Sequence, residues 1–304
     1  MRVSSISVFH SITQNLGRLQ SDMYKANNMI ASGKTINTLS DDPAGMMTVL
    51  DLRSNFANID QLARNIAMGR TWVNMGESAL SQTEDVLIDA KVLCVSMASD
   101  NNGAQARSDA AEVVDGYLDQ ILSLANTQVG GRYIFSGTKT DTAPFTLAND
   151  EVTYAGNDTP FSIKLGEDLD IAVGRDGETI FGDDDFDWTD PAVGHGNIFK
   201  TLVDLKTYLQ NNDQSGIQGT LDKMDTHLSS IRSLISNTGG KIIRLDVKEK
   251  IIQDLNLNYT ERISRLEDAD IAEAIIELES KELAYKAALS SSAQIMQLSL
   301  VDYL

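Results

Sequence analysis

Apolar residues near the start of the chain recur at alternating steps of three and four, the spacing of a helix face that packs against another helix. The repeat runs through Phe9, Ile12, Leu16, Leu19, Met23, Ala26 and Ile30. It predicts an N-terminal helix with a continuous packing seam. That helix is expected to end near Gly33, since glycine readily takes the left-handed conformation of a helix C-cap.

A similar helical pattern returns over the last forty residues, where it widens into two stripes. One stripe comprises Ile271, Ile275, Leu278, Tyr285, Leu289 and Met296, and the other comprises Leu266, Ala269, Ile276, Leu283 and Ala287. One partner helix covers only one stripe, so this helix is expected to contact several neighbours. The residues predicted to serve assembly are Phe9, Ile12, Leu16, Leu19, Met23, Ile30, Ile271, Ile275, Leu278, Leu283, Leu289 and Met296.

Two long helical patterns lie inside these terminal segments. In the turn Asp41-Asp42-Pro43, an Asp is expected to cap the next helix and Pro43 to occupy its first position, where a missing N–H costs nothing. The helix is predicted to run to about Met97, and a further one to end at Gly130-Gly131. Later, a short helix over 198–209 precedes a second long one. Gly239-Gly240 interrupts that helix, which predicts either a bend or a close helix contact.

The hydrophobic period changes between about residues 132 and 190. Short strands are predicted over 152–154, 161–165 and 169–173, and residues 174–177 are expected to form a hairpin turn before a strand at 179–181. Residues 141–195 also hold 14 Asp or Glu against Lys164 and Arg175. The chain therefore contains an acidic β-rich insert between helical parts.

These elements predict a mainly α protein with a small β insert, built from long antiparallel helical rods. Residues 1–40 and 262–304 form a terminal coiled-coil assembly domain, 41–131 and 196–261 form a helical rod domain, and 132–195 form the insert. The two ends can pair only if the chain doubles back through the insert. The insert is therefore expected at the far end of the molecule.

Charge and hydropathy exclude several classes of partner. The formal net charge of -19 repels nucleic acid and anionic membrane surfaces. No run approaches the roughly 20 apolar residues of a membrane-spanning helix, and residues 1–30 lack the features of a cleaved signal peptide. The single Cys94 lies in a helical pattern, where most such residues fill the core.

The sequence shows no pattern of residues typical of catalysis or metal binding. His10, His195 and His227 are far apart, with no Cys or His at metal-ligand spacing beside them. Asp183-Asp184-Asp185 and Asp187 lack the spaced ligands and closing Glu of an EF-hand loop, so a solvated loop is expected. We expect no enzyme activity, no cofactor and no metal.

The sequence resembles those of the bacterial flagellin superfamily over nearly the whole chain, except in the variable middle. Asn15-Leu16, residues 31–37 (ASGKTIN) and residues 41–45 (DDPAG) resemble its N-terminal signature, and residues 264–270 (SRLEDAD) resemble its C-terminal one. Residues 130–137 (GGRYIFSG), Pro144-Phe145 and the ending 299–304 (SLVDYL) resemble the hook–filament junction proteins of that superfamily.

The resemblance implies a structural subunit of the flagellum, outside the cell, exported by the flagellar type III apparatus without a cleaved signal. It implies these partners: neighbouring copies, the hook-associated protein FlgK, flagellin, and an FlgN-like export chaperone at the C-terminal helix. It also implies that Asp41, Asp42 and Pro43 lie at a domain junction. We further predict that residues 1–40 and 262–304 are poorly ordered in the free protein and fold when neighbouring subunits cover them.

Three alternatives stay open. The chain can be a filament flagellin, against which the short insert and the Asp302-Tyr303-Leu304 ending argue. It can be a binding module whose acidic insert holds a cationic or glycan ligand. An enzyme has only the weak support of carboxylates in that insert. For the terminal segments, the alternative to folding on assembly is an ordinary intramolecular helix bundle.

Overall fold

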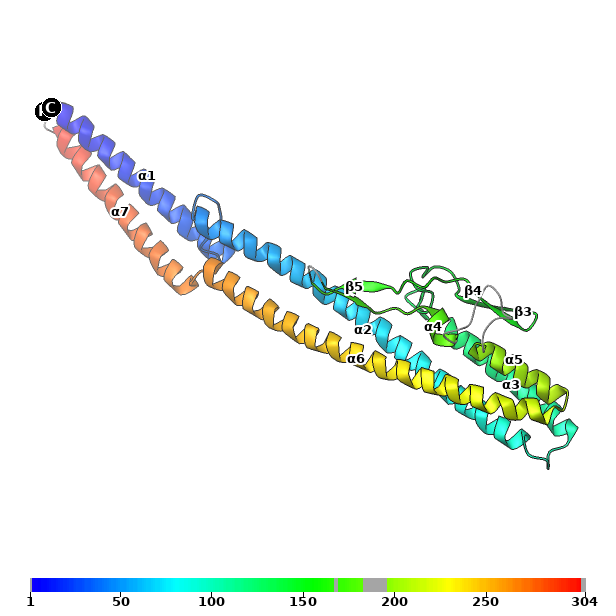
Figure 1. The fold of residues 1–304 in the computed structure, drawn as a ribbon. Helices are drawn as coiled ribbons and strands as arrows, with labels where there is room; N and C mark the ends of the chain where they lie inside the picture. The colour runs from blue at the N-terminus through cyan, green and yellow to red at the C-terminus, as the bar shows by residue number, and fades with distance from the viewer. Residues whose placement is uncertain (1, 167–168, 183–195, 302–304) are drawn as a thin grey trace. The chain divides into compact units, whose positions relative to one another are not determined.

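The computed structural model describes residues 2–166, 169–182 and 196–301, with side chains for residue 7 and for 9–294 outside the two gaps (Figure 1). The described fold is mainly helical, as predicted, with short antiparallel strand pairs. Its helices are α1 (Arg2–Ser32), α2 (Pro43–Met97), α3 (Ala104–Ala125), α4 (Gly177–Phe181), α5 (Ile198–Gln210), α6 (Gln214–Glu267) and α7 (Ile271–Val301).

The chain forms two compact units, a terminal unit of Met1–Asp60 with Asp254–Leu304 and a central unit of Gln61–Gln253. In the terminal unit, α1 and α7 lie side by side (Figure 1). Lys34, just beyond α1, forms an antiparallel backbone β-bridge with Asp268, just before α7. Further along, Lys281 Nζ lies 3.7 Å from Asp22 Oδ2. These two contacts show that the terminal helices run antiparallel.

In the central unit, α2 and α6 run antiparallel as well. Arg70 of α2 contacts Glu249 of α6, whereas Lys91, 21 residues further along α2, contacts the earlier Asp225 of α6. The short helices α3 and α5 pack against each other, and α5 contacts α6, where Thr201 Oγ1 lies 3.0 Å from His227 Nε2. Cys94 of α2 is fully buried, which confirms its expected place in the core, and its thiol donates to the carbonyl of Ile217 at 3.2 Å.

The described part of the insert, together with residues 128–129 just before it, contains three two-stranded antiparallel sheets. They pair β1 (Gln128–Val129) with β2 (Arg132–Tyr133), β3 (Phe145–Ala148) with β4 (Glu151–Tyr154), and β5 (Ser162–Lys164) with β6 (Asp170–Ala172). The last three strands match predicted ones, but β3 was not expected. Phe145 aligns with Tyr154, and its ring contacts Tyr154, Phe181 and Phe199 at centroid distances of 5.1–5.4 Å. These aromatic rings form the core of the insert.

Two local predictions were wrong, each for a local reason, and of the two alternatives at Gly239-Gly240, a bend or a close helix contact, the structure excludes the close contact. Helix α3 ends at Ala125, and Gly130 and Gly131, with φ of +57° and +79°, form the turn between β1 and β2. Residues 177–181 form α4, not a strand, because the Asp176 carboxylate accepts from Thr179 N and caps a helix. Helix α6 continues through Gly239 and Gly240, and a Cβ on either would meet nothing within 4 Å. The predicted close helix contact is therefore absent.

Candidate functional site

The seam between α1 and α7 has the spacing of a coiled coil. On α1, Ala26 is buried, and its neighbours along the predicted seam are half-buried: Ile12, Leu16, Leu19, Met23 and Ile30. On α7 the residues turned from solvent recur at steps of four and three: Ala274, Leu278, Lys281, Tyr285, Ala288 and Ser292. Apart from Leu278 and Tyr285 these are small or polar, so α7 covers α1 without using its other large apolar side chains.

Those larger side chains remain on the surface of the terminal unit. Leu283 is 71% exposed and Ile276 is 68% exposed, and the two are seven residues apart on one face. At 3.6 residues per turn this face lies about 140° around the helix from Leu278. Other predicted assembly residues are also exposed: Phe9, Ile271, Ile275 and Leu289. The side chain of Met296 lies outside the described part.

The chain leaves α1 through a connector that is bonded to the loop before α7. Gly33, with φ of +71°, ends the helix, and its carbonyl accepts from Ala269 N at 2.9 Å. Thr35 continues these contacts. It donates to the carbonyl of Glu267 through its backbone N–H, at 2.7 Å, and through its hydroxyl, at 2.9 Å. Backbone contacts thus hold the two ends of the junction together.

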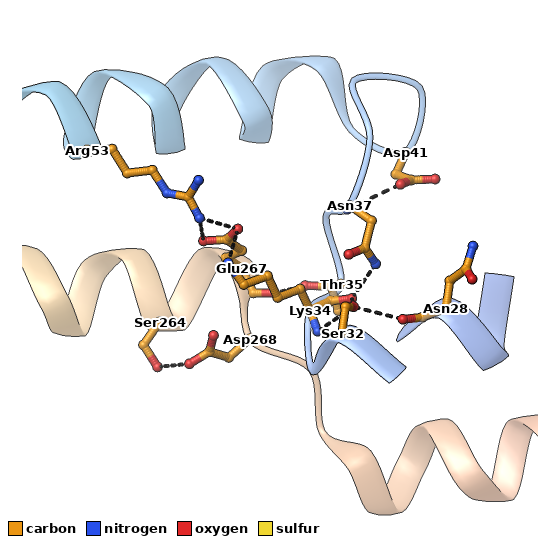
Figure 2. A network of polar contacts seen from close by, with 10 residues as sticks. All are labelled: Asn28, Ser32, Lys34, Thr35, Asn37, Asp41, Arg53, Ser264, Glu267 and Asp268. Atoms are coloured by element: carbon orange, nitrogen blue, oxygen red, sulfur yellow. Dashed lines mark hydrogen bonds and ion pairs between the residues drawn. The ribbon is translucent and has the colours of Figure 1, made fainter. Parts of the chain in front are cut away.

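At the centre of this junction lies the carboxylate of Glu267 (Figure 2). Its side chain is only 6% exposed, and it accepts from Lys34 Nζ at 2.8 Å. Arg53 Nη2, from α2, lies 2.7 Å from both carboxylate oxygens. The two cations are 38% and 47% exposed, so one buried anion is shared by two partly solvated partners. These salt bridges link the connector and α2 to the end of α6.

The aspartates of the junction act as caps and turn ligands. Asp42 Oδ1 accepts from the backbone of Ala44 at 3.1 Å and of Gly45 at 3.0 Å, and Pro43 is the first residue of α2, as predicted. Asp41 Oδ2 instead accepts from Thr38 N at 2.8 Å and Thr38 Oγ1 at 2.9 Å. These bonds from Thr38 lower the pKa of Asp41.

Two segments that sequence analysis treated separately therefore meet in space. Residues 31–37 and 264–270 form the two sides of the junction (Figure 2). Asp270 caps α7, where its Oδ1 accepts from Ala272 N and Glu273 N. Sequence analysis did not single out Glu267, Lys34 or Arg53. No spacing signal could have found this trio, because Arg53 and Glu267 are 214 positions apart.

Nothing in the described part of the chain resembles a catalytic or metal centre. Among the described residues no group of three or more His, Cys, Asp or Glu could hold a metal ion. His10 is exposed, and His227 is buried 3.0 Å from the Thr201 hydroxyl. His195 and the aspartates Asp183, Asp184, Asp185 and Asp187 lie outside the described residues. Within the described part, no helix is long and apolar enough to span a membrane.

Comparison with known proteins shows similarity along the whole chain. The family model of the bacterial flagellin N-terminal helical region matches residues 3–140. Flagellar hook-associated protein 3 of Escherichia coli (strain K12) is 26% identical over 94% of this chain and 96% of its own. Flagellin of Bacillus subtilis (strain 168) is 22% identical over 97% of this chain and 95% of its own.

Solved structures share the fold. A structure of flagellar hook-associated protein-3 from Legionella pneumophila aligns with a TM-score of 0.63 at 16% identity, over 72% of this chain and 98% of that one. A crystal structure of Bacillus cereus FlgL aligns with a TM-score of 0.58 at 22% identity, over 70% of this chain and 99% of that one. At these identities the comparison concerns architecture alone.

Proposed function

Because this chain belongs to the bacterial flagellin superfamily, we propose that it is a structural subunit of the flagellum that joins the hook to the flagellin filament. Two relatives that align with nearly all of the chain are hook-associated proteins, and this supports the junction over the filament. Flagellins also align with nearly all of the chain, at 22% identity against 24–26% for the hook-associated proteins, so the filament remains the competing position.

The observation that carries the proposal is the apolar surface left on the terminal helix pair. Ile276 and Leu283 lie on a face of α7 that is turned from α1, and both are more than two-thirds exposed. Burying such a side chain contributes about 1.5–3 kcal/mol, which a neighbouring subunit gains on contact. A repeated apolar face on the paired ends is expected of a subunit that is completed by its neighbours.

For partners, we propose neighbouring copies of this chain, FlgK on the hook side and flagellin on the filament side. An FlgN-like export chaperone is proposed to cover the exposed face of α7 before assembly, by helix-in-groove recognition. The protein is then exported without a cleaved signal and resides outside the cell in the flagellum. Its proposed role is structural and involves no catalysis.

The junction around Glu267 supports a second part of the proposal. Hydrogen bonds there join the connector after α1 to the loop before α7. The chain therefore leaves α1 and enters α7 at the same junction. We propose that Asp41, Asp42 and Pro43 mark the junction between the assembly helices and the rod. Residues 1–40 and 262–304 are proposed to fold fully only when neighbours cover them.

Location within the flagellum tests the proposed position. The full chain, carrying an epitope in the exposed turn at residues 100–102, is expressed in a strain that lacks its own junction subunit, and flagella are labelled with a specific antibody. We expect label only where the hook meets the filament, together with restored filament growth. Label along the whole filament identifies a flagellin instead.

Amide hydrogen exchange of the purified monomer tests folding on assembly separately. We expect fast exchange over residues 1–40 and 262–304 and slow exchange over the rods at 50–97 and 217–258. Equal protection throughout the chain contradicts this part of the proposal and indicates a self-contained bundle. The assignment to the junction does not depend on that result.

A further inference from the structure

A small cavity in the central unit lies apart from the terminal helices and combines apolar walls with two cations. It has a volume of about 20 Å³ and lies between α2, the insert and α6. Its apolar walls include Trp72, Leu80 and Phe135, and its charged groups are Arg175 and Lys241. Among the described residues that line it, none carries a carboxylate.

Trp72 lines this cavity and carries an unpaired hydrogen-bond donor. The residue is only 4% exposed, and its indole Nε1 has no acceptor within the described part of the chain. An indole N–H can only donate, so no rotation or tautomer can satisfy it in another way. A buried donor without a partner is costly, which makes a ligand that accepts hydrogen bonds favourable at this position.

Lys241 and Arg175 add two positive charges without a countercharge in the cavity. Lys241 is half-buried and forms no ion pair among the described residues, and burial, with Arg175 and Arg244 nearby, lowers the pKa of its ammonium to about 8. Burial also lowers the pKa of Arg175. Among the described residues, the side-chain hydrogen bonds of Arg175 leave from Nη2, toward Leu234, Asn237 and Thr238, and none leaves from Nε or Nη1.

We propose that this cavity binds one monatomic anion, chloride under physiological conditions, among the indole N–H of Trp72, the guanidinium of Arg175 and the ammonium of Lys241. The volume admits one small particle. A water molecule also fits it, but only an anion offsets the two cations.

The bound anion would tie the insert to the long helices. It offsets the repulsion between Arg175, in the insert, and Lys241, on α6. The α2 residues in the lining are uncharged, so Arg175 and Arg244 are the charges acting on Lys241. An anion favours the charged amine, so its binding takes up a proton near pH 8 and weakens as pH rises above that value.

Thermal unfolding in chloride and in gluconate at equal ionic strength tests the site in solution. Gluconate is too large for the cavity. At chloride tenfold above its dissociation constant, the midpoint of the unfolding transition should rise by about 3–6 °C. Lys241→Met should remove this response and should itself raise the midpoint in gluconate, because it removes an unpaired buried cation. Lys250→Met, at an exposed position of the same helix, should keep the response.

Crystals of the full chain soaked in bromide locate the ion directly. We expect an anomalous peak within hydrogen-bond distance of Trp72 Nε1 and Lys241 Nζ, and no peak there in crystals of Trp72→Phe or Lys241→Met. A cavity that holds water in bromide overturns the proposal, as does a wild-type midpoint that is the same in chloride and gluconate. Neither result bears on the proposed place of the protein in the flagellum.

Discussion

Replacing Glu267 by Gln tests how strongly the junction is held. Gln keeps the size of the side chain and one carbonyl oxygen, but it removes the charge and turns an amide NH₂ toward one of the two cations. A hydrogen bond to a charged group contributes about 1.5–3 kcal/mol. Lys34 and Arg53 are 38% and 47% exposed, so water partly solvates them after the change. We expect a local cost of about 2 kcal/mol.

Hydrogen exchange at the junction is measured on subunits assembled on hooks, because the terminal segments of the free chain are proposed to exchange fast. Local exchange is the appropriate assay, since a chain with two compact units need not unfold in one step. The amides of Thr35 and Ala269 bond across the junction to Glu267 and Gly33. A loss of about 2 kcal/mol corresponds to roughly 30-fold faster exchange at both amides. Combining Glu267→Gln with Arg53→Met should cost less than the sum of the two single changes, because the residues are in contact.

Glu249→Gln provides the matched control. Glu249 contacts Arg70 at 2.6 Å, but its side chain is 35% exposed and the pair lies in the central unit. The same substitution there should cost less than about 1 kcal/mol and leave exchange at Thr35 and Ala269 unchanged. If Glu267→Gln accelerates exchange at these two amides no more than Glu249→Gln does, the reasoning about the buried carboxylate is refuted.

Three further predictions concern single groups. Asp42→Ala removes the cap of α2 and should lower the free energy of unfolding by about 1 kcal/mol, measured by denaturant titration. Gly240→Ala should raise it by about 0.5–1 kcal/mol in the same assay, because the helix is regular there and the added methyl meets nothing; a loss of stability would reveal a contact. Burial raises the pKa of Tyr154 to about 12, so ultraviolet titration should show one tyrosine ionising near pH 12, against about 10 for an ordinary one. The stability linked to its neutral phenol is complete below pH 10 and is lost as pH rises toward 12.

The long helices and their packing seam could be predicted from the sequence because they depend on apolar side chains that repeat along many residues. The seam from Ile12 to Ile30, the two long helices, and the start of α2 at Pro43 all follow from spacing and capping rules. Shorter elements were missed where one interaction decides the structure. One carboxylate, that of Asp176, turns residues 177–181 into a helix, and the pairing of Phe145 with Tyr154 completes a strand of only four residues.

The functional surface was predictable only in part. Two apolar stripes on the C-terminal helix indicated several neighbours, but spacing cannot tell which stripe faces the same chain. In the structure the seam toward α1 uses Ala274, Leu278 and Ala288, and Ile276 and Leu283 stay exposed. Glu267 was missed because a charged residue near a helix end is usually solvated. Its burial depends on Lys34 and Arg53, which are distant in sequence.

Retention of the subunit at the hook tests the central claim, that the exposed face of α7 is an assembly surface. The variant Ile276→Ser with Leu283→Ser is compared with Ile243→Ser with Val247→Ser, which alters aliphatic residues of α6 that are 65% and 54% exposed. Each variant is expressed in a strain without its own junction subunit, and the protein is measured on purified hooks and in the medium. We predict that the α7 variant is exported but lost to the medium, whereas the α6 variant stays on hooks and supports filaments. Equal retention of the two variants would contradict the account.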